Sequence, residues 1–179
     1  MKKYWFLILW STLFFSFENF QFNLSKAAIK KMDKTLADLW QGKTITKKPI
    51  NLSIENKKKL SFPLKNETFY QLIINTKTSA YLVLSKGKGK MNFFDYMIVY
   101  NLDLSILKVK LLVYREEYGG EIGSDRWLKQ FTGKSNPNQM KFGNDIQNIS
   151  GATISAQSIN EDIIKVTKQL IELKEKGII

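Results

Sequence analysis

The chain has 179 residues, a net charge of +12 at pH 7, and neither cysteine nor histidine. The missing cysteines exclude disulfides, iron–sulfur clusters, c-type haem attachment and a lipid anchor on cysteine. The missing histidines remove the usual zinc ligand, the usual proton shuttle and every Ser-His or Cys-His nucleophile arrangement. A redox function in this chain would therefore depend on an organic cofactor.

The positive charge comes mainly from lysines spread along the chain, with arginine only at Arg115 and Arg126. Charge of this sign attracts nucleic acids and anionic lipids. Arginine is the residue expected for base readout, however, and no nucleic-acid-binding motif is visible. We interpret the lysines as a solvated surface and expect no nucleic-acid partner.

Residues 1–22 have the pattern of a targeting segment. Two lysines precede an apolar run over residues 4–17, which is typical of a secretory signal and short for a membrane span of about 20 residues. No small-x-small cleavage site is evident, so we expect either a signal peptide or an uncleaved N-terminal membrane anchor. Both predict an extracytoplasmic location, on the periplasmic side of the cytoplasmic membrane. The alternative interpretation of this run is a buried core strand.

Residues 23–179 are expected to form one domain. Ser25 is a candidate cap for a helix from about Lys26 to Gln41, which Gly42 would end. β-Branched and aromatic residues then predict strands separated by short turn-prone segments. The expected strands are 68–75, 80–86, 93–101 and 104–114, with one further strand around 50–54. Loops this short argue for antiparallel pairing.

The segment Lys86-Gly87-Lys88-Gly89-Lys90 joins two of these strands. Its glycines and lysines suggest a phosphate cradle, but it lacks the spacing and the following helix of a P-loop. A lysine-flanked hairpin turn is the favoured interpretation.

Two helices are expected after the strands. Ser124 or Asp125 would cap a short helix through Phe131. A long C-terminal helix, capped at Ser155 or Ser158, carries an apolar stripe at helical spacing. The stripe consists of Ile159, Ile163, Val166, Leu170 and Leu173. The predicted fold is α+β, an antiparallel sheet with an N-terminal helix and a long C-terminal helix packed on it.

Small and hydroxylic residues gather just before the C-terminal helix, over Ile149–Ser155. Backbone N–H groups at a helix N-terminus bind phosphate, helped by the helix dipole. Gly151 and Ala152 let the backbone approach a ligand closely, and Thr153 and Ser155 offer hydroxyls. On these residues alone, a plain helix cap is the favoured interpretation over an anion site.

The segment Ser150-Gly151-Ala152-Thr153 resembles the flavinylation motif of the FMN-binding domain family. That family includes the FMN-carrying subunits of the sodium-translocating NADH:quinone oxidoreductase and of Rnf-type complexes. The resemblance implies the fold of an FMN-binding domain, and a flavin transferase that moves FMN from FAD onto the threonine hydroxyl. Thr153 would then carry FMN through a phosphoester, with Ser155 as a further matching position.

The sequence before the motif also resembles the family. A loop after the last long strand, residues 115–122, contributes Glu117, Tyr118 and Gly119 as expected cofactor-binding residues. Trp127 begins a W-L-x-Q-F-x-G-K segment that lies between that loop and the motif. Order and spacing agree over about residues 93–175.

Two positions depart from the family pattern. Gln147 stands three positions before Ser150, where the transferase is expected to recognise an acidic residue, and the nearest acid is Asp145. Tyr118-Gly119 stands where the large-complex subunits have Thr-Pro-Gly. The second departure favours a small stand-alone carrier over a subunit of the sodium pump.

Aromatic side chains near the motif are candidates to pack on the flavin ring, namely Tyr118, Trp127 and Phe131. For the last two, core packing is an equally weighted alternative, and Glu117 would either hydrogen-bond the ring or hold its loop. Arg115, Arg126 or Lys129 would favour an anionic reduced flavin if one of them lies close.

We expect an electron carrier rather than an enzyme, because no catalytic acid or base is evident. Its expected partners are a flavin transferase for maturation and a membrane electron-transfer protein. The alternatives are a flavin-dependent reductase with its own substrate and a flavin-free cell-envelope binding protein. The sequence lacks the nicotinamide-binding Gly-x-Gly-x-x-Gly pattern that would support the reductase. The presence of Thr153 argues against the flavin-free binding protein.

Overall fold

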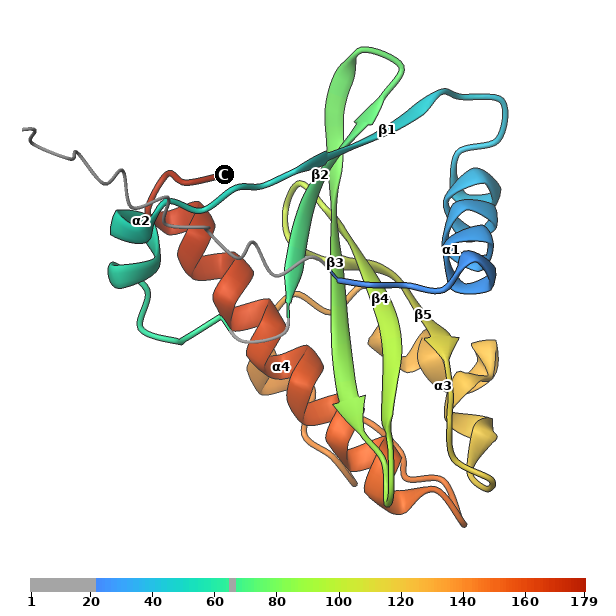
Figure 1. Ribbon diagram of the computed structural model, residues 1–179. Helices are drawn as coiled ribbons and strands as arrows, with labels where there is room; N and C mark the ends of the chain where they lie inside the picture. The colour runs from blue at the N-terminus through green and yellow to red at the C-terminus, as the bar shows by residue number, and fades with distance from the viewer. Residues whose placement is uncertain (1–21, 65–66) are drawn as a thin grey trace, which may run out of the picture.

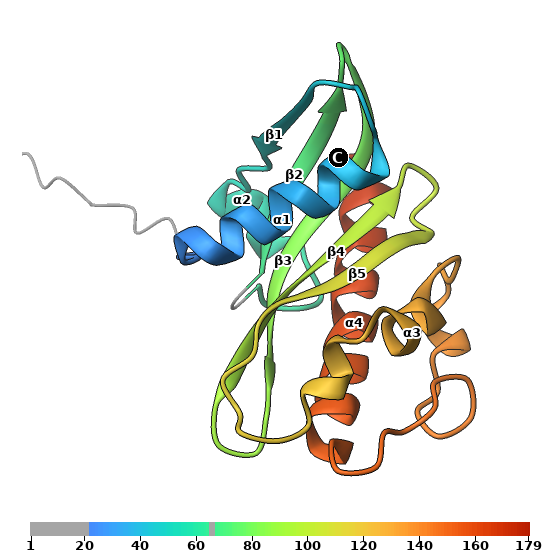
Figure 2. The ribbon, with the colours of Figure 1, turned by 90° about the vertical axis from the view of Figure 1, so that its right-hand side faces the viewer.

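A computed structural model describes residues 22–64 and 67–179 (Figures 1 and 2). The predicted signal peptide or anchor, residues 1–22, lies outside this range except for Phe22, which is buried. Within the described ranges, no helix combines the length and the apolar character that a membrane span requires.

Five strands form one antiparallel sheet, in which each strand pairs with its neighbour in the sequence. Four predicted strands are confirmed with small shifts at their ends. The strands are β1 Ile45–Pro49, β2 Thr68–Ile74, β3 Lys77–Lys88, β4 Phe93–Asn101 and β5 Ile106–Val113. The segment predicted as a hairpin turn, residues 86–90, ends β3 and enters the turn to β4, which confirms that interpretation.

The prediction of a strand around residues 50–54 is wrong. Ser53 accepts a hydrogen bond from the Asn56 N–H at 3.1 Å and caps a short helix, α2 (Ile54–Lys58), instead. The strand before β2 in the sequence is β1, which pairs with β2 at the edge of the sheet and ends in Pro49. Proline and lysine are the residues that protect an edge strand, so this strand lacks the apolar pattern of the others.

Helices cover both faces of the sheet (Figures 1 and 2). The N-terminal helix α1 (Lys26–Leu39) packs on one face, and Ser25 caps it by accepting the Ala28 N–H, as predicted. The C-terminal helix α4 (Thr153–Glu175) packs on the other face with its predicted stripe fully buried. The sheet therefore separates two apolar cores, one under each helix. This arrangement confirms the predicted α+β fold.

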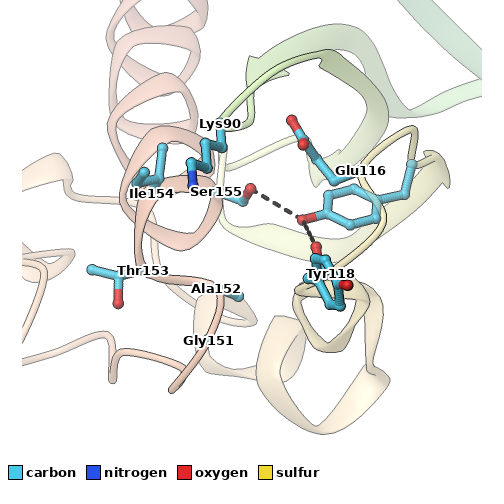
Figure 3. Close-up of a pocket in the computed structure, with 9 residues that line it drawn as sticks. Lys90, Glu116, Tyr118, Gly151, Ala152, Thr153, Ile154 and Ser155 are labelled. Atoms are coloured by element: carbon cyan, nitrogen blue, oxygen red, sulfur yellow. Dashed lines mark hydrogen bonds between the residues drawn. The ribbon is translucent and has the colours of Figure 1, made fainter.

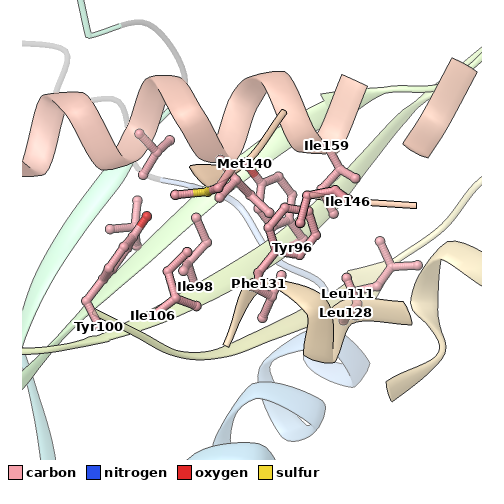
Figure 4. Packing of buried hydrophobic residues seen from close by; sticks show 14 of the residues in the cluster. Tyr96, Ile98, Tyr100, Ile106, Leu111, Leu128, Phe131, Met140, Ile146 and Ile159 are labelled. Carbon is pink, nitrogen blue, oxygen red and sulfur yellow. The ribbon is translucent and has the colours of Figure 1, made fainter. Parts of the chain in front are cut away.

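The central strand β4 shows why the strand predictions succeeded. Tyr96 and Ile98 face α4, whereas Met97 and Val99 face α1, and all four side chains are fully buried. A strand covered on both faces reads as a continuous apolar run. Figure 4 shows the α4 side of this packing, which is the larger of the two cores.

Both predicted caps of the C-terminal helix are wrong, because α4 begins at Thr153, ahead of them. Ser158 accepts the Lys88 N–H at 2.8 Å and ties the helix to the end of β3. Ser155 is buried in the first turn, where its hydroxyl contacts that of Tyr114 at 3.1 Å. Each of these two serines therefore has a tertiary partner.

Short helices connect β5 to α4 and cover one end of the larger core. They are η1 (Gly120–Gly123), α3 (Asp125–Leu128), η2 (Lys129–Phe131) and η3 (Pro137–Gln139). Ser124 caps α3, as predicted, by accepting the Trp127 N–H. Asp125 bonds Lys108 and Lys110 on β5, each at 3.0 Å, and these bonds hold the pKa of that carboxyl below its usual range.

One ionic cluster ties α4 to the sheet. Lys165 bonds the carboxylates of Glu67 at 2.6 Å and Asp162 at 2.5 Å, and the Glu67 side chain is fully buried. Asp162 also accepts the hydroxyls of Ser85 and Tyr96. Burial alone would lower the pKa of Lys165, but the two carboxylates outweigh it and raise that pKa.

Candidate functional site

The motif residues lie where a loop turns into α4. Gly151 has φ of +79°, a backbone conformation that glycine adopts without strain. Ala152 is the N-cap of α4, and its side chain forms no capping hydrogen bond. Thr153 is the first residue of the helix and is exposed. The N-terminal turn of a 23-residue helix therefore opens on the surface without a side-chain cap.

A cleft of about 260 Å³ opens beside this turn (Figure 3). Three segments far apart in the sequence enclose it: the β3–β4 turn, the loop after β5 and the start of α4. Its lining consists of Lys90, Tyr114, Glu116, Tyr118, Gly151, Ala152, Thr153, Ile154 and Ser155.

The Tyr114 hydroxyl joins two of these segments. It donates a hydrogen bond to the Tyr118 carbonyl at 3.0 Å and lies 3.1 Å from the Ser155 hydroxyl. Because Tyr114 has only one proton and gives it to the carbonyl, Ser155 is the donor to Tyr114. The loop after β5 is thereby fixed to the first turn of α4.

Gly119 brings the same loop close to the motif. Its φ is +81°, and a Cβ built on it would lie 3.0 Å from both the Ala152 Cβ and the Tyr114 hydroxyl. The loop can approach the helix this closely only with glycine at this position. The neighbouring Tyr118 side chain is 80% exposed and borders the open side of the cleft.

Asn148 orients the proposed acceptor hydroxyl. Its side-chain amide donates a hydrogen bond to Thr153 Oγ1 at 3.0 Å, while its carbonyl oxygen accepts the Ile149 N–H at 2.7 Å. The threonine oxygen thus accepts a hydrogen bond from the amide, and its own hydroxyl proton remains available to donate.

Trp127 lies in the core and does not line the cleft. Its indole N–H donates to the Gln147 carbonyl at 2.7 Å, and its ring meets Phe131 edge-on with centroids 5.6 Å apart. Gln130 holds the same point of the chain, because its side-chain oxygen accepts the Gln147 N–H at 2.8 Å. The segment that resembles W-L-x-Q-F therefore anchors the loop before the motif. Core packing, the alternative for Trp127 and Phe131, is confirmed.

The two glutamates after β5 have different surroundings. Glu116 lines the cleft and accepts the backbone N–H groups of Met91 at 2.8 Å and Asn92 at 2.7 Å. Glu117, the glutamate selected from the sequence, is exposed and is not part of the lining. Glu117 is expected from the sequence either to hydrogen-bond the flavin ring or to hold its loop. In the structure, Glu116 is the residue that ties the loop after β5 to the β3–β4 turn.

The cation of the cleft is also different from those expected. Arg115 pairs with the buried Asp95 and donates to the Phe93 carbonyl at 2.9 Å. Arg126 and Lys129 do not line the cleft, whereas Lys90 does. The segment interpreted as a hairpin turn thus also delivers a lysine to the site.

Most of the predicted site residues come together. Gly151, Ala152, Thr153, Ser155 and Tyr118 line the cleft, and Gly119 packs behind it. Ser150 is exposed in the adjoining loop, outside the lining. Sequence reasoning missed other residues of the lining and one residue that orients the threonine. These are Lys90, Tyr114, Glu116, Ile154 and Asn148.

The residues present suit a flavin mononucleotide. An uncapped helix N-terminus with Gly151 beside it offers N–H groups to a phosphate. Tyr118 and Ile154, 80% and 54% exposed, provide apolar surface for a planar ring. A metal centre has no comparable support, since no group of three potential acidic, cysteine or histidine ligands occurs among the described residues.

Comparison with known proteins supports the same cofactor. The sequence model of the FMN-binding domain family matches residues 89–167, a range that contains every residue lining the cleft. A search of curated proteins gave no match. Residues 89–167 therefore match the FMN-binding domain family, and this match supports FMN as the cofactor of the cleft.

Proposed function

We propose that this protein is an extracytoplasmic electron carrier that holds FMN covalently, through a phosphoester to Thr153. The observation that carries the proposal is the placement of Thr153. The one threonine of the cleft is exposed at the first position of α4, inside the region that matches the FMN-binding domain family. An exposed acceptor is accessible to a modifying enzyme.

The attachment needs a flavin transferase and FAD. The Thr153 oxygen would attack the FMN phosphorus of FAD, forming the phosphoester as the pyrophosphate bond breaks and AMP leaves. The hydroxyl proton leaves with the transferase or solvent. Asn148 would keep the threonine oxygen pointed outward, because its amide already donates to that oxygen at 3.0 Å.

The chain's own residues then hold the cofactor in place. Bound FMN would supply reversible electron uptake, which no side chain of this protein can provide. The N–H groups of the first turn of α4 would bind the phosphate oxygens. Tyr118 and Ile154 would shelter the ring, and the Tyr114–Ser155 contact would keep the two walls of the cleft together.

The N-terminal sequence supports the proposed location. The lysines at positions 2 and 3 and the apolar run over residues 4–17 support export or anchoring to the cytoplasmic membrane. A phosphoester would keep the cofactor from being lost on that side of the membrane. A membrane electron-transfer protein is the expected redox partner.

Co-expression with a flavin transferase tests the proposal. The full chain should retain yellow colour and in-gel flavin fluorescence after denaturation, and Thr153→Val should lose both. Thr132→Val is the matched control, because Thr132 is also exposed and lies outside the cleft; it should behave as the wild type. Flavin that dissociates from the wild type on denaturation would refute the covalent bond, and a colourless wild type would refute the function.

A further inference from the structure

Lys90 places a positive charge at the lining of the cleft. It stands in the turn between β3 and β4, and Figure 3 shows its side chain extending toward the first turn of α4. Within the part of the chain that the structure describes, no carboxylate forms an ion pair with Lys90. Its charge is therefore available to a ligand in the cleft.

Glu116 fixes the turn that carries this lysine. One carboxylate oxygen accepts the N–H groups of the two residues that follow Lys90, at 2.8 and 2.7 Å. Gly89 lies directly under that carboxylate, since a Cβ at Gly89 would come within 2.3 Å of the same oxygen. The turn is closed further by the Gly89 N–H, which donates to the Asn92 carbonyl at 2.7 Å.

We propose that Lys90 raises the reduction potential of the flavin in this cleft and that Glu116 positions Lys90 to do so. This inference rests on the proposed function. The oxidised ring is neutral, whereas uptake of two electrons and one proton leaves it with one negative charge. A cation within about 4–6 Å favours the charged form, so Lys90 would stabilise the reduced flavin. The negative charge of Glu116 would disfavour the reduced flavin. Two backbone N–H groups bind this carboxylate, so it opposes Lys90 less strongly than a carboxylate without hydrogen bonds would.

The test is a spectroelectrochemical titration of the full-length holoprotein, with dithionite as reductant in the presence of redox mediators. Lys90→Gln should lower the midpoint potential, and a tenfold loss of preference for the reduced flavin corresponds to about 30 mV for a two-electron couple. Lys88→Gln is the matched control. It removes the same charge from the same hairpin, at an exposed side chain outside the cleft lining, and should leave the potential unchanged.

A second variant tests the positioning role while keeping the lysine. Gly89→Ala forces the Glu116 carboxylate away from the turn and should move the potential in the direction of Lys90→Gln. A midpoint potential in Lys90→Gln equal to that of the wild type overturns the proposal, as does an equal shift in the Lys88→Gln control. An unchanged potential in Gly89→Ala overturns the role of Glu116. A wild type that binds no flavin overturns the proposed function itself, an outcome distinct from the other three.

Discussion

Replacing Trp127 by phenylalanine separates an anchoring role from contact with the flavin. The substitution keeps an aromatic ring that can still meet Phe131 but removes the N–H that binds the Gln147 carbonyl at 2.7 Å. A buried polar group that loses its hydrogen-bond partner typically costs about 1–3 kcal/mol. The cost here should be about 1 kcal/mol, because Gln147 is exposed and water can reach its carbonyl. The space left by the smaller side chain adds about 1 kcal/mol. We expect Trp127→Phe to lower the free energy of unfolding by about 2 kcal/mol.

Urea unfolding followed by circular dichroism measures this change, and the slope with denaturant should stay constant. Flavin loading should fall, because the loop before Thr153 loses one of its two anchors, while the absorption spectrum of the flavin that does bind should be unchanged. Gln130→Ala removes the other anchor and should act in the same way. Unchanged stability, or a shifted flavin spectrum in Trp127→Phe, would refute the reasoning, since a shifted spectrum would mean that the indole contacts the ring.

Three further changes test separate features of the structure. Gly119→Ala should cost about 1–2 kcal/mol and reduce flavin loading, because φ of +81° strains alanine and its Cβ would crowd Ala152; urea unfolding and the ratio of flavin to protein absorbance measure both effects, and a neutral variant would contradict the close approach. Lys165→Met should cost roughly 2–3 kcal/mol in thermal or urea unfolding, because it removes the cation that bonds both carboxylates, and the partial exposure of the Lys165 side chain keeps the cost below that of a fully buried pair. Asp125→Asn should be less stable than the wild type at neutral pH by under about 1 kcal/mol. The pKa of Asp125 is lowered in the folded state, so its contribution is present above the unfolded pKa of about 3.9 and is lost as pH falls through the folded value; a difference that persists at the acid end of a pH series of unfolding curves would contradict this assignment.

Regular periodicity made much of the fold predictable. The stripe of α4 and the continuous apolar run of β4 are the direct consequences of burial on one helix face and on both sheet faces. β1 was not predicted, because an edge strand with lysines and a proline lacks the continuous apolar run of a buried strand. The start of α4 was not predicted either, since Ala152 caps without a side-chain hydrogen bond and the serines farther along bind other segments.

The site was predictable where its residues are consecutive and hidden where folding assembles it. The motif itself identified Gly151 to Ser155 as a place where a ligand could approach the backbone. Lys90 reaches the same cleft only because the β3–β4 turn ends beside α4, a contact between residues about 60 positions apart in the sequence. The choice between Glu116 and Glu117 depends on which way the chain turns after β5, and a shift of one residue reverses it.

The central claim is the covalent bond at Thr153, and peptide mass spectrometry tests it most directly. Trypsin cleavage after Lys141 and Lys165 releases residues 142–165, which contain a single threonine and three serines. In protein matured by a flavin transferase, this peptide should gain the mass of FMN less one water, and fragmentation should place the gain on Thr153. An unmodified peptide, or a gain located on Ser150, Ser155 or Ser158, would contradict the account.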